Sequence, residues 1–145
     1  IGKEKLLLVT MLRQPIIELL ETTLRLISVA SGYQTDFNGV LLWQSVPTEY
    51  GQNAIYVKDV LEKYEKHGTK YTAVLKVEIV AVVIETATDS AAKLGNLALA
   101  DLIKAVSSIS YPGAFFILKD ASKWIETQGK TACQVELNID VKYQF

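Results

Sequence analysis

The two side-chain types most often used as a general base and as a nucleophile, histidine and cysteine, occur once each and lie far apart in the sequence. The only histidine, His67, lies in a charged stretch beside Gly68, and no serine, cysteine or carboxylate motif supports it as a general base or a metal ligand. The only cysteine, Cys133, lies on the apolar side of an alternating pattern. A single cysteine allows neither an intrachain disulfide nor a cysteine-based metal cluster. We therefore expect His67 to be a solvated loop residue and Cys133 to be an inert core residue.

Carboxylate pairs are the other candidates for chemistry. Glu78 and Glu85 fall in one predicted strand but on opposite faces. Glu136 and Asp140 share one face of another strand, about 13 Å apart at the rise of an extended chain, which is too far for both to act on one bond. The sequence has no glycine-rich phosphate loop, and its lysines and arginines are scattered among acidic residues. We expect no catalytic site, no cofactor and no metal.

The composition indicates one folded domain covering residues 1–145. Half of the residues are hydrophobic and 21% are charged, which excludes a disordered chain. The formal net charge of −1 gives no overall attraction to nucleic acid or anionic lipid. The longest apolar run, residues 79–84, is too short to span a bilayer, and we expect no signal peptide. The single cysteine fits a reducing compartment.

A first helix is predicted over residues 15–30. Pro15, after Gln14, is tolerated in the first turn of a helix, and apolar residues then recur at helical spacing up to Gly32, where the helix should end. Residues 3–12 either extend this helix or form a separate arm.

A second helix is predicted over residues 89–108, with Thr88 or Asp89 as its N-cap. Gly95 lies on the apolar stripe of this helix, where a glycine costs about 1 kcal/mol relative to alanine. A close approach of the helix to a sheet would explain a glycine there. The stripe otherwise consists of Ala91, Leu94, Ala98, Leu99, Leu102, Ala105 and Val106.

Two long strands stand out. Residues 71–85 alternate at first and then become apolar on both faces over residues 79–84, so a helix of the same chain or a neighbouring subunit should cover the second face. Residues 133–145 alternate strictly, as in an antiparallel strand with one buried and one solvated face. Shorter extended segments are predicted at residues 33–35, 40–43, 54–58 and 115–118. The charged residues 59–69 form a hairpin tip or a short helix, and residues 120–129 a polar turn-rich segment.

These elements predict an α+β fold with a mainly antiparallel sheet and two main helices packed on one face. The order of the elements resembles that of the phage tail-terminator family and its relatives among tail-completion and minor tail proteins. The resemblance covers most of the chain, but it depends on element order and on no catalytic motif. The matching segments are an N-terminal helix, a strand entered through Val46-Pro47 and continuing at residues 55–57, a charged hairpin loop at 58–70, a long strand at 71–85, a helix at 89–108 and a final alternating strand ending in residues 141–145.

The resemblance implies a structural virion protein, located in the tail–neck region and assembled in the host cytoplasm. Such a protein forms a homo-oligomer, expected to be a hexameric ring, which caps the tail tube, ends tail polymerisation and provides a docking surface for the head–tail connector. The implied partners are therefore the tail tube protein and a connector or neck protein. We expect no sequence-specific nucleic-acid binding, although DNA would pass through the ring, and no membrane.

Two sets of residues are candidates for assembly. Ring subunits need apolar surface beyond their own core and contacts that close on themselves. Glu136 and Asp140, on the solvated face of the last strand, are expected to face the channel, where like charge would repel DNA. The candidate assembly interface comprises Lys58, Asp59, Glu62, Lys63, Lys66, Ile79, Val82 and Ile84.

Two alternatives remain open from the sequence. Another neck or head–tail joining component would show the same type of fold and would bind the portal side instead of the tube. A small ligand-binding or enzymatic α+β domain would need a pocket with convergent polar groups, and nothing in the sequence indicates one.

Overall fold

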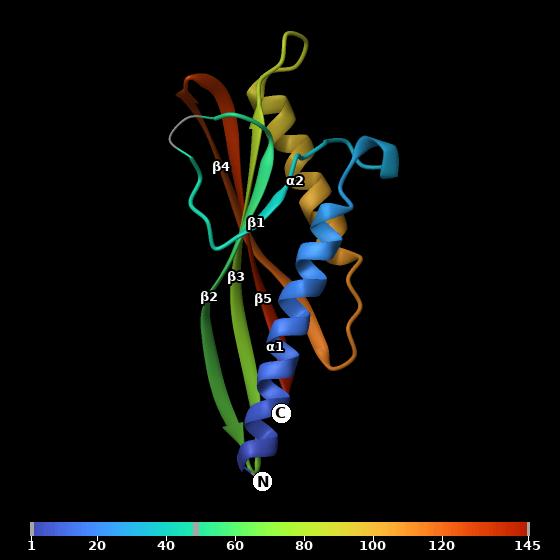
Figure 1. The fold of residues 1–145 in the computed structure, drawn as a ribbon, viewed down its shortest axis with the longest axis vertical. Helices are drawn as coiled ribbons and strands as arrows, with labels where there is room; N and C mark the ends of the chain where they lie inside the picture. Colours follow the sequence, from blue (N-terminus) through green and yellow to red (C-terminus); the bar gives the residue numbers. More distant parts are fainter. Residues whose placement is uncertain (1, 48–49, 145) are drawn as a thin grey trace.

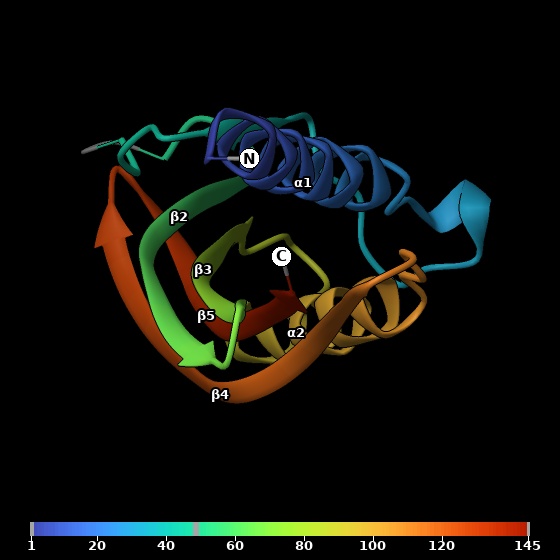
Figure 2. The same ribbon diagram turned by 90° about the horizontal axis from the view of Figure 1, so that it is seen from below.

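The computed structural model describes residues 2–47 and 50–144, which form a five-stranded sheet with two long helices on one face. The strands lie in the order β1-β2-β3-β5-β4, and only the pairing of β1 with β2 is parallel. Figures 1 and 2 show the sheet strongly twisted, with α1 and α2 on the same side of it. The predicted α+β class is therefore confirmed. The elements are α1 (Gly2–Arg25), η1 (Val29–Ser31), β1 (Val40–Leu42), β2 (Ala54–His67), β3 (Lys70–Ile84), α2 (Ala91–Ser107), β4 (Ala114–Gln128) and β5 (Lys130–Gln144).

The first helix is longer at its start than predicted and ends earlier. Pro15 lies inside α1 and does not begin it, so residues 3–12 extend the helix. A proline removes one intrahelical hydrogen bond, but here the helix lies along the β2–β3 hairpin and Arg13 is bound to two carboxylates of β2. These tertiary contacts offset the local preference. The helix ends at Arg25, and Gly32 instead caps η1 with φ of 91°.

The charged stretch after residue 58 is the far half of a long hairpin and contains no helix. β2 continues to His67 and pairs with β3 in an antiparallel register from Ala54↔Val82 to His67↔Lys70. Gly68, with φ of 64°, lies in the turn that joins the two strands. The predicted long strand at residues 71–85 is confirmed as β3.

The second helix packs closely on the centre of the sheet. Ser90, and neither Thr88 nor Asp89, is its N-cap, because the Ser90 side chain accepts from the Lys93 N–H. The predicted close approach at Gly95 is confirmed, since a Cβ there would lie 3.1 Å from Cys133 Cβ and well inside van der Waals contact of Cys133 Sγ.

The last two strands form a second long hairpin. The stretch at residues 120–129, expected to be turn-rich, is mostly strand, because β4 pairs with β5 from Ala114↔Tyr143 to Gln128↔Lys130. Its polar residues tolerate a strand because β4 is an edge strand whose residues 119–127 are exposed. The alternating strand at the end of the chain is confirmed as β5, with residue 145 outside the described residues. Residues 33–35 are not a strand.

A second, smaller apolar cluster lies on the sheet face away from the helices. Tyr50, in the segment between β1 and β2, packs with Ala54, Tyr56, Val82 and Ala132. This segment covers the end of the face over residues 79–84. A helix of the same chain therefore covers one face of residues 79–84, and this loop covers part of the other, on which Val80 and Ile84 stay half-buried. Cover by a neighbouring subunit stays a prediction.

Candidate functional site

The predicted assembly residues divide into exposed and internal ones. Lys63 and Lys66 are exposed on the β2–β3 hairpin, and Lys58 and Ile84 are half-buried. Ile79 and Val82 are 0% and 2% exposed within the single chain. Ile79 faces the helices and Val82 lies under Tyr50, so neither is available to a neighbouring subunit.

Asp59 and Glu62 are also internal, because of a β-bulge. The register of β2 shifts between Asp59 and Leu61, so that one extra residue, Val60, lies opposite β3. Without the bulge, residues 59 and 62 would point to opposite faces. With it, both carboxylates face α1, where their side chains are only 14% and 4% exposed.

Arg13 of α1 binds both of these carboxylates. Its Nη2 lies 2.8 Å from Asp59 Oδ2, and its Nη1 lies 2.8 Å from Glu62 Oε2. Partial burial alone would lower the pKa of Arg13, but its hydrogen bond to Asp59 and the charges of Glu62 and Asp59 outweigh that effect and raise it. The guanidinium therefore stays charged and holds α1 against β2.

Three aromatic side chains complete this ion cluster. The Trp43 indole N–H donates to Asp59, and the hydroxyls of Tyr143 and Tyr64 donate to Glu62. Trp43 has φ of 55°, an uncommon conformation for a bulky residue. Its backbone N–H donates to the Val57 carbonyl at 2.9 Å, so both ends of the residue are fixed. The cluster thus joins α1, β2 and β5, and its carboxylates are fully engaged in structural contacts.

The sheet face away from the helices, which we call the open face, carries Glu136 and Asp140. The register places Glu136 beside Val80 and Asp140 beside Lys76, and it confirms that the two acids share a face. Lysines lie among them: the ammonium of Lys119 is 3.9 Å from Asp140, and Lys142 is the next outward-facing residue of β5. The two acids therefore share this face with lysines, and the expectation that Glu136 and Asp140 face a channel stays a prediction.

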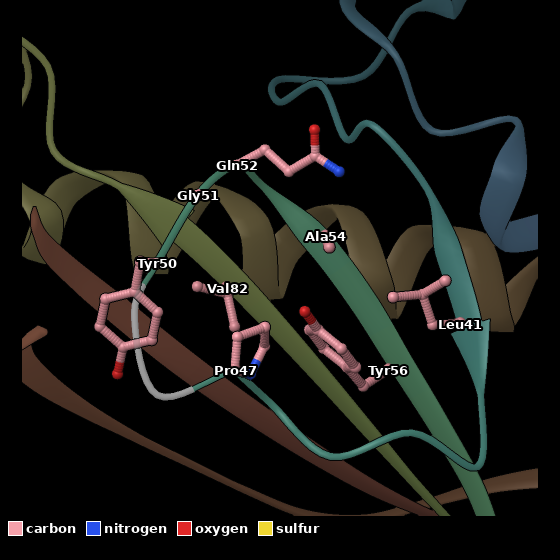
Figure 3. Close-up of a pocket in the computed structure, with 8 residues that line it drawn as sticks. All are labelled: Leu41, Pro47, Tyr50, Gly51, Gln52, Ala54, Tyr56 and Val82. Atoms are coloured by element: carbon pink, nitrogen blue, oxygen red, sulfur yellow. The ribbon is translucent and has the colours of Figure 1, made fainter. Parts of the chain in front are cut away.

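A cavity lies at the end of the open face, under the segment between β1 and β2. Its volume is about 370 Å³, within the size range of small-ligand sites. Figure 3 shows Tyr50 and Tyr56 in its wall together with Pro47 and Val82. The Tyr50 hydroxyl accepts from Gln134 Nε2 at 2.6 Å and contacts Glu126 at 3.3 Å. The lining thus offers apolar contact and tyrosine hydroxyls, but no nucleophile beside a base.

The two residues with reactive side chains lie apart from this cavity. Cys133 is fully buried beneath Gly95, and burial raises the pKa of its thiol. His67 ends β2 at the hairpin turn and is exposed, with Nε2 3.7 Å from the Glu65 carboxylate. Among residues 2–47 and 50–144, no three His, Cys, Asp or Glu side chains gather closely enough to hold a metal ion. In the same part of the chain, no helix is both long and apolar enough to cross a membrane.

The buried contacts of Asp101 and the ion pairs of Arg13 were not predicted from the sequence. Asp101 is 2% exposed and accepts from the backbone N–H groups of Gln34 and Thr35, the latter at 2.7 Å. An acidic residue in the middle of an apolar helical stripe was the available signal. Arg13 gave no comparable signal, because its partners lie 46 and 49 residues away.

Neither the protein-family models nor the curated proteins include a match to this chain.

Proposed function

We propose that this chain is a non-catalytic structural subunit of the tail-terminator type, which assembles into a ring that caps a phage tail tube. The ring ends tube growth and offers its other side to the head–tail connector. This proposal rests on the element order set out above, with the charged stretch forming a long hairpin.

The observation that carries the proposal is the amount of apolar surface left over after the core is formed. Val60, Leu61 and Tyr64 are 43%, 44% and 56% exposed on the β2–β3 hairpin. On the edge strand β4, Phe115 and Ile125 are 70% and 51% exposed. Single exposed apolar residues are common, but here they recur on both faces of a long hairpin and of an edge strand, where an exposed sheet edge favours contact with another chain. The hairpin and the edge strand β4 thus offer two different surfaces, as heterologous contacts in a ring require.

The test uses the purified chain alone and mixed with polymerised tail tube protein, followed by light scattering and negative-stain imaging. Closed rings or caps on tube ends are expected. Leu61→Glu should abolish both, whereas Val29→Glu, at a position 56% exposed on η1, should not. A chain that stays monomeric with tubes and binds portal-side assemblies instead would favour a head–tail joining role.

The cavity under the β1–β2 segment favours a second candidate, a small-ligand binding domain. Screening apolar fragments by ligand-observed NMR would test it. Binding that Val82→Phe blocks, without unfolding the chain, would support this candidate over the structural one.

A further inference from the structure

A polar hollow lies on the open face, beside the cavity described above. Its volume is about 210 Å³, and Gln44 and Val46 of the segment that joins β1 to β2 form one of its sides. The strand pairing places Val80 of β3 between Tyr56 of β2 and Glu136 of β5, and all three line the hollow. Pockets for drug-sized molecules have volumes of roughly 300–1,000 Å³, so this hollow suits one group of side-chain size.

Two acidic side chains of the hollow have no cation of their own. Glu78 and Glu136 are diagonal neighbours on β3 and β5, a placement that separates two residues by about 7–8 Å. Both are half-buried, and neither forms an ion pair in the part of the chain that the structure describes. Lys58, opposite Glu78 on β2, also lines the hollow and forms no ion pair there. Two acids and one base leave the hollow negatively charged, and partly desolvated charges are stabilised by a partner.

A buried amide turns its oxygen toward the same hollow. Gln134 is 8% exposed and lines the hollow. The Tyr50 hydroxyl donates its one proton to Glu126, so it accepts from Gln134 Nε2 at 2.6 Å. This leaves Gln134 Oε1 without a partner among residues 2–47 and 50–144, where every fully enclosed side-chain oxygen has one. Oε1 is therefore not enclosed, and it offers an acceptor to a donor placed in the hollow.

The aromatic lining of the hollow also favours a cation. Trp124 of β4 lies opposite Gln134 and is 37% exposed. The face of a tryptophan ring attracts an ammonium group more strongly than that of any other side chain. Tyr56 lines both the hollow and the neighbouring cavity, and Figure 3 shows its ring in the wall between Leu41 and Pro47. The lining thus combines carboxylates, an amide oxygen and ring faces.

We propose that the hollow binds one organic ammonium group carried on a short alkyl stem. The ammonium has three donors, which reach the carboxylates of Glu78 and Glu136 and the oxygen of Gln134. The stem packs on Val80 and on the ring of Trp124. The whole site belongs to a single chain, so it depends neither on the proposed ring nor on a ligand in the neighbouring cavity. An ammonium of this kind is carried by a free alkylamine or by a lysine of a partner protein.

NMR titration of the ¹⁵N-labelled chain tests the site, because the chain has only two tryptophans. n-Butylamine, which is protonated at neutral pH, should shift the indole N–H signal of Trp124. The indole N–H of Trp43, which donates to Asp59, should stay in place. n-Butanol has the same stem without the charge and should bind at least about tenfold more weakly. A blocked lysine peptide that binds more tightly than n-butylamine would identify a partner's side chain as the source of the ammonium, and a more weakly binding one would identify a free amine.

Two substitutions at the hollow should change the affinity in opposite directions. Glu136→Gln keeps the size of the side chain and removes its charge, so n-butylamine should bind at least about tenfold more weakly. Lys58→Met removes the competing cation and should tighten binding several-fold. Glu65→Gln makes the same change of charge as Glu136→Gln at the exposed β2–β3 hairpin and should leave the affinity unchanged. Val82→Phe fills the neighbouring cavity, which Val82 lines and the hollow does not share, and should also leave it unchanged.

Circular dichroism melts of each variant check that it is folded. The proposal is overturned if n-butylamine leaves the Trp124 signal in place, if n-butanol binds equally well, or if folded Glu136→Gln binds like the wild type. Weaker binding by Lys58→Met would overturn it as well, because it would make the lysine part of the site and the ligand an anion. Ring formation and fragment binding in the cavity are measured separately, so their failure is read apart from this one.

Discussion

Replacing Gly95 by alanine should destabilise the protein, although alanine is the better helix former. In a solvated helix this change would stabilise by about 1 kcal/mol. Here the added methyl group would overlap Cys133 Sγ and lie 3.1 Å from Cys133 Cβ. Cys133 is fully buried on β5, between β3 and β4, so it has little room to move. Overpacking of this kind costs about 1–3 kcal/mol, and we expect a net loss of about 1 kcal/mol.

The same geometry predicts coupling between the two positions. Cys133→Ala removes the overlapping sulfur and should cost about 1 kcal/mol by itself, as the loss of a small buried group does. In the double variant the new methyl group occupies part of the vacated space. Its free energy of unfolding should exceed the value expected from adding the single effects by about 1–2 kcal/mol.

Urea unfolding monitored by tryptophan fluorescence measures all four stabilities, provided that the m-values agree. A Gly95→Ala variant about 1 kcal/mol more stable than the wild type would mean that helix propensity alone governs the position. Additive single effects would likewise refute the reasoning, because they would show that the alanine methyl and the Cys133 sulfur do not compete for space.

Three further perturbations test the polar anchors and the buried thiol. Arg13→Met should lower the free energy of unfolding by about 1–3 kcal/mol, between the values for exposed and buried ion pairs, because it leaves the Glu62 carboxylate without its cation. Arg13→Lys should recover part of this loss in the same urea assay. An unchanged urea midpoint for Arg13→Met would contradict the role of Arg13 in holding α1 against β2. Asp101→Ala should cost about 2–4 kcal/mol by removing an acceptor that binds several donors around Thr35, and hydrogen exchange should show the N–H of residue 35 losing protection. Burial raises the pKa of the Cys133 thiol, so the unfolded chain loses this proton first as pH rises past about 8.5. The free energy of unfolding should therefore fall less at alkaline pH in Cys133→Ala than in the wild type. A thiol reagent should label the buried Cys133 only at the rate of unfolding.

The placement of charged groups was predicted less well than the strands. Asp59 and Glu62 belong to a run of charged residues and were expected on the surface. A single bulge at Val60 turns both toward α1, where Arg13 meets them. Nothing in the local pattern of charges distinguishes this arrangement from a solvated hairpin, because the partner comes from another element.

The predicted bounds of two elements, β4 and α1, were wrong for a related reason. β4 continues to Gln128 through residues of turn-prone type, since this segment pairs with β5 along its whole length. α1 passes through Pro15 because the helix is supported along the β2–β3 hairpin. In both cases a tertiary contact offsets an unfavourable local preference.

The sequence by itself determined the α+β class, the alternating strand β5, the doubly apolar half of β3 and the reason for a glycine at position 95. These depend on periodicity and side-chain size, which act between near neighbours in the chain. Only the tertiary structure decided that the segment with Tyr50 packs on the second face of residues 79–84 and that Arg13 binds Asp59 and Glu62. Both depend on contacts between residues far apart in the chain. The second also depends on the bulge at Val60, because one inserted residue turns every following side chain to the other face.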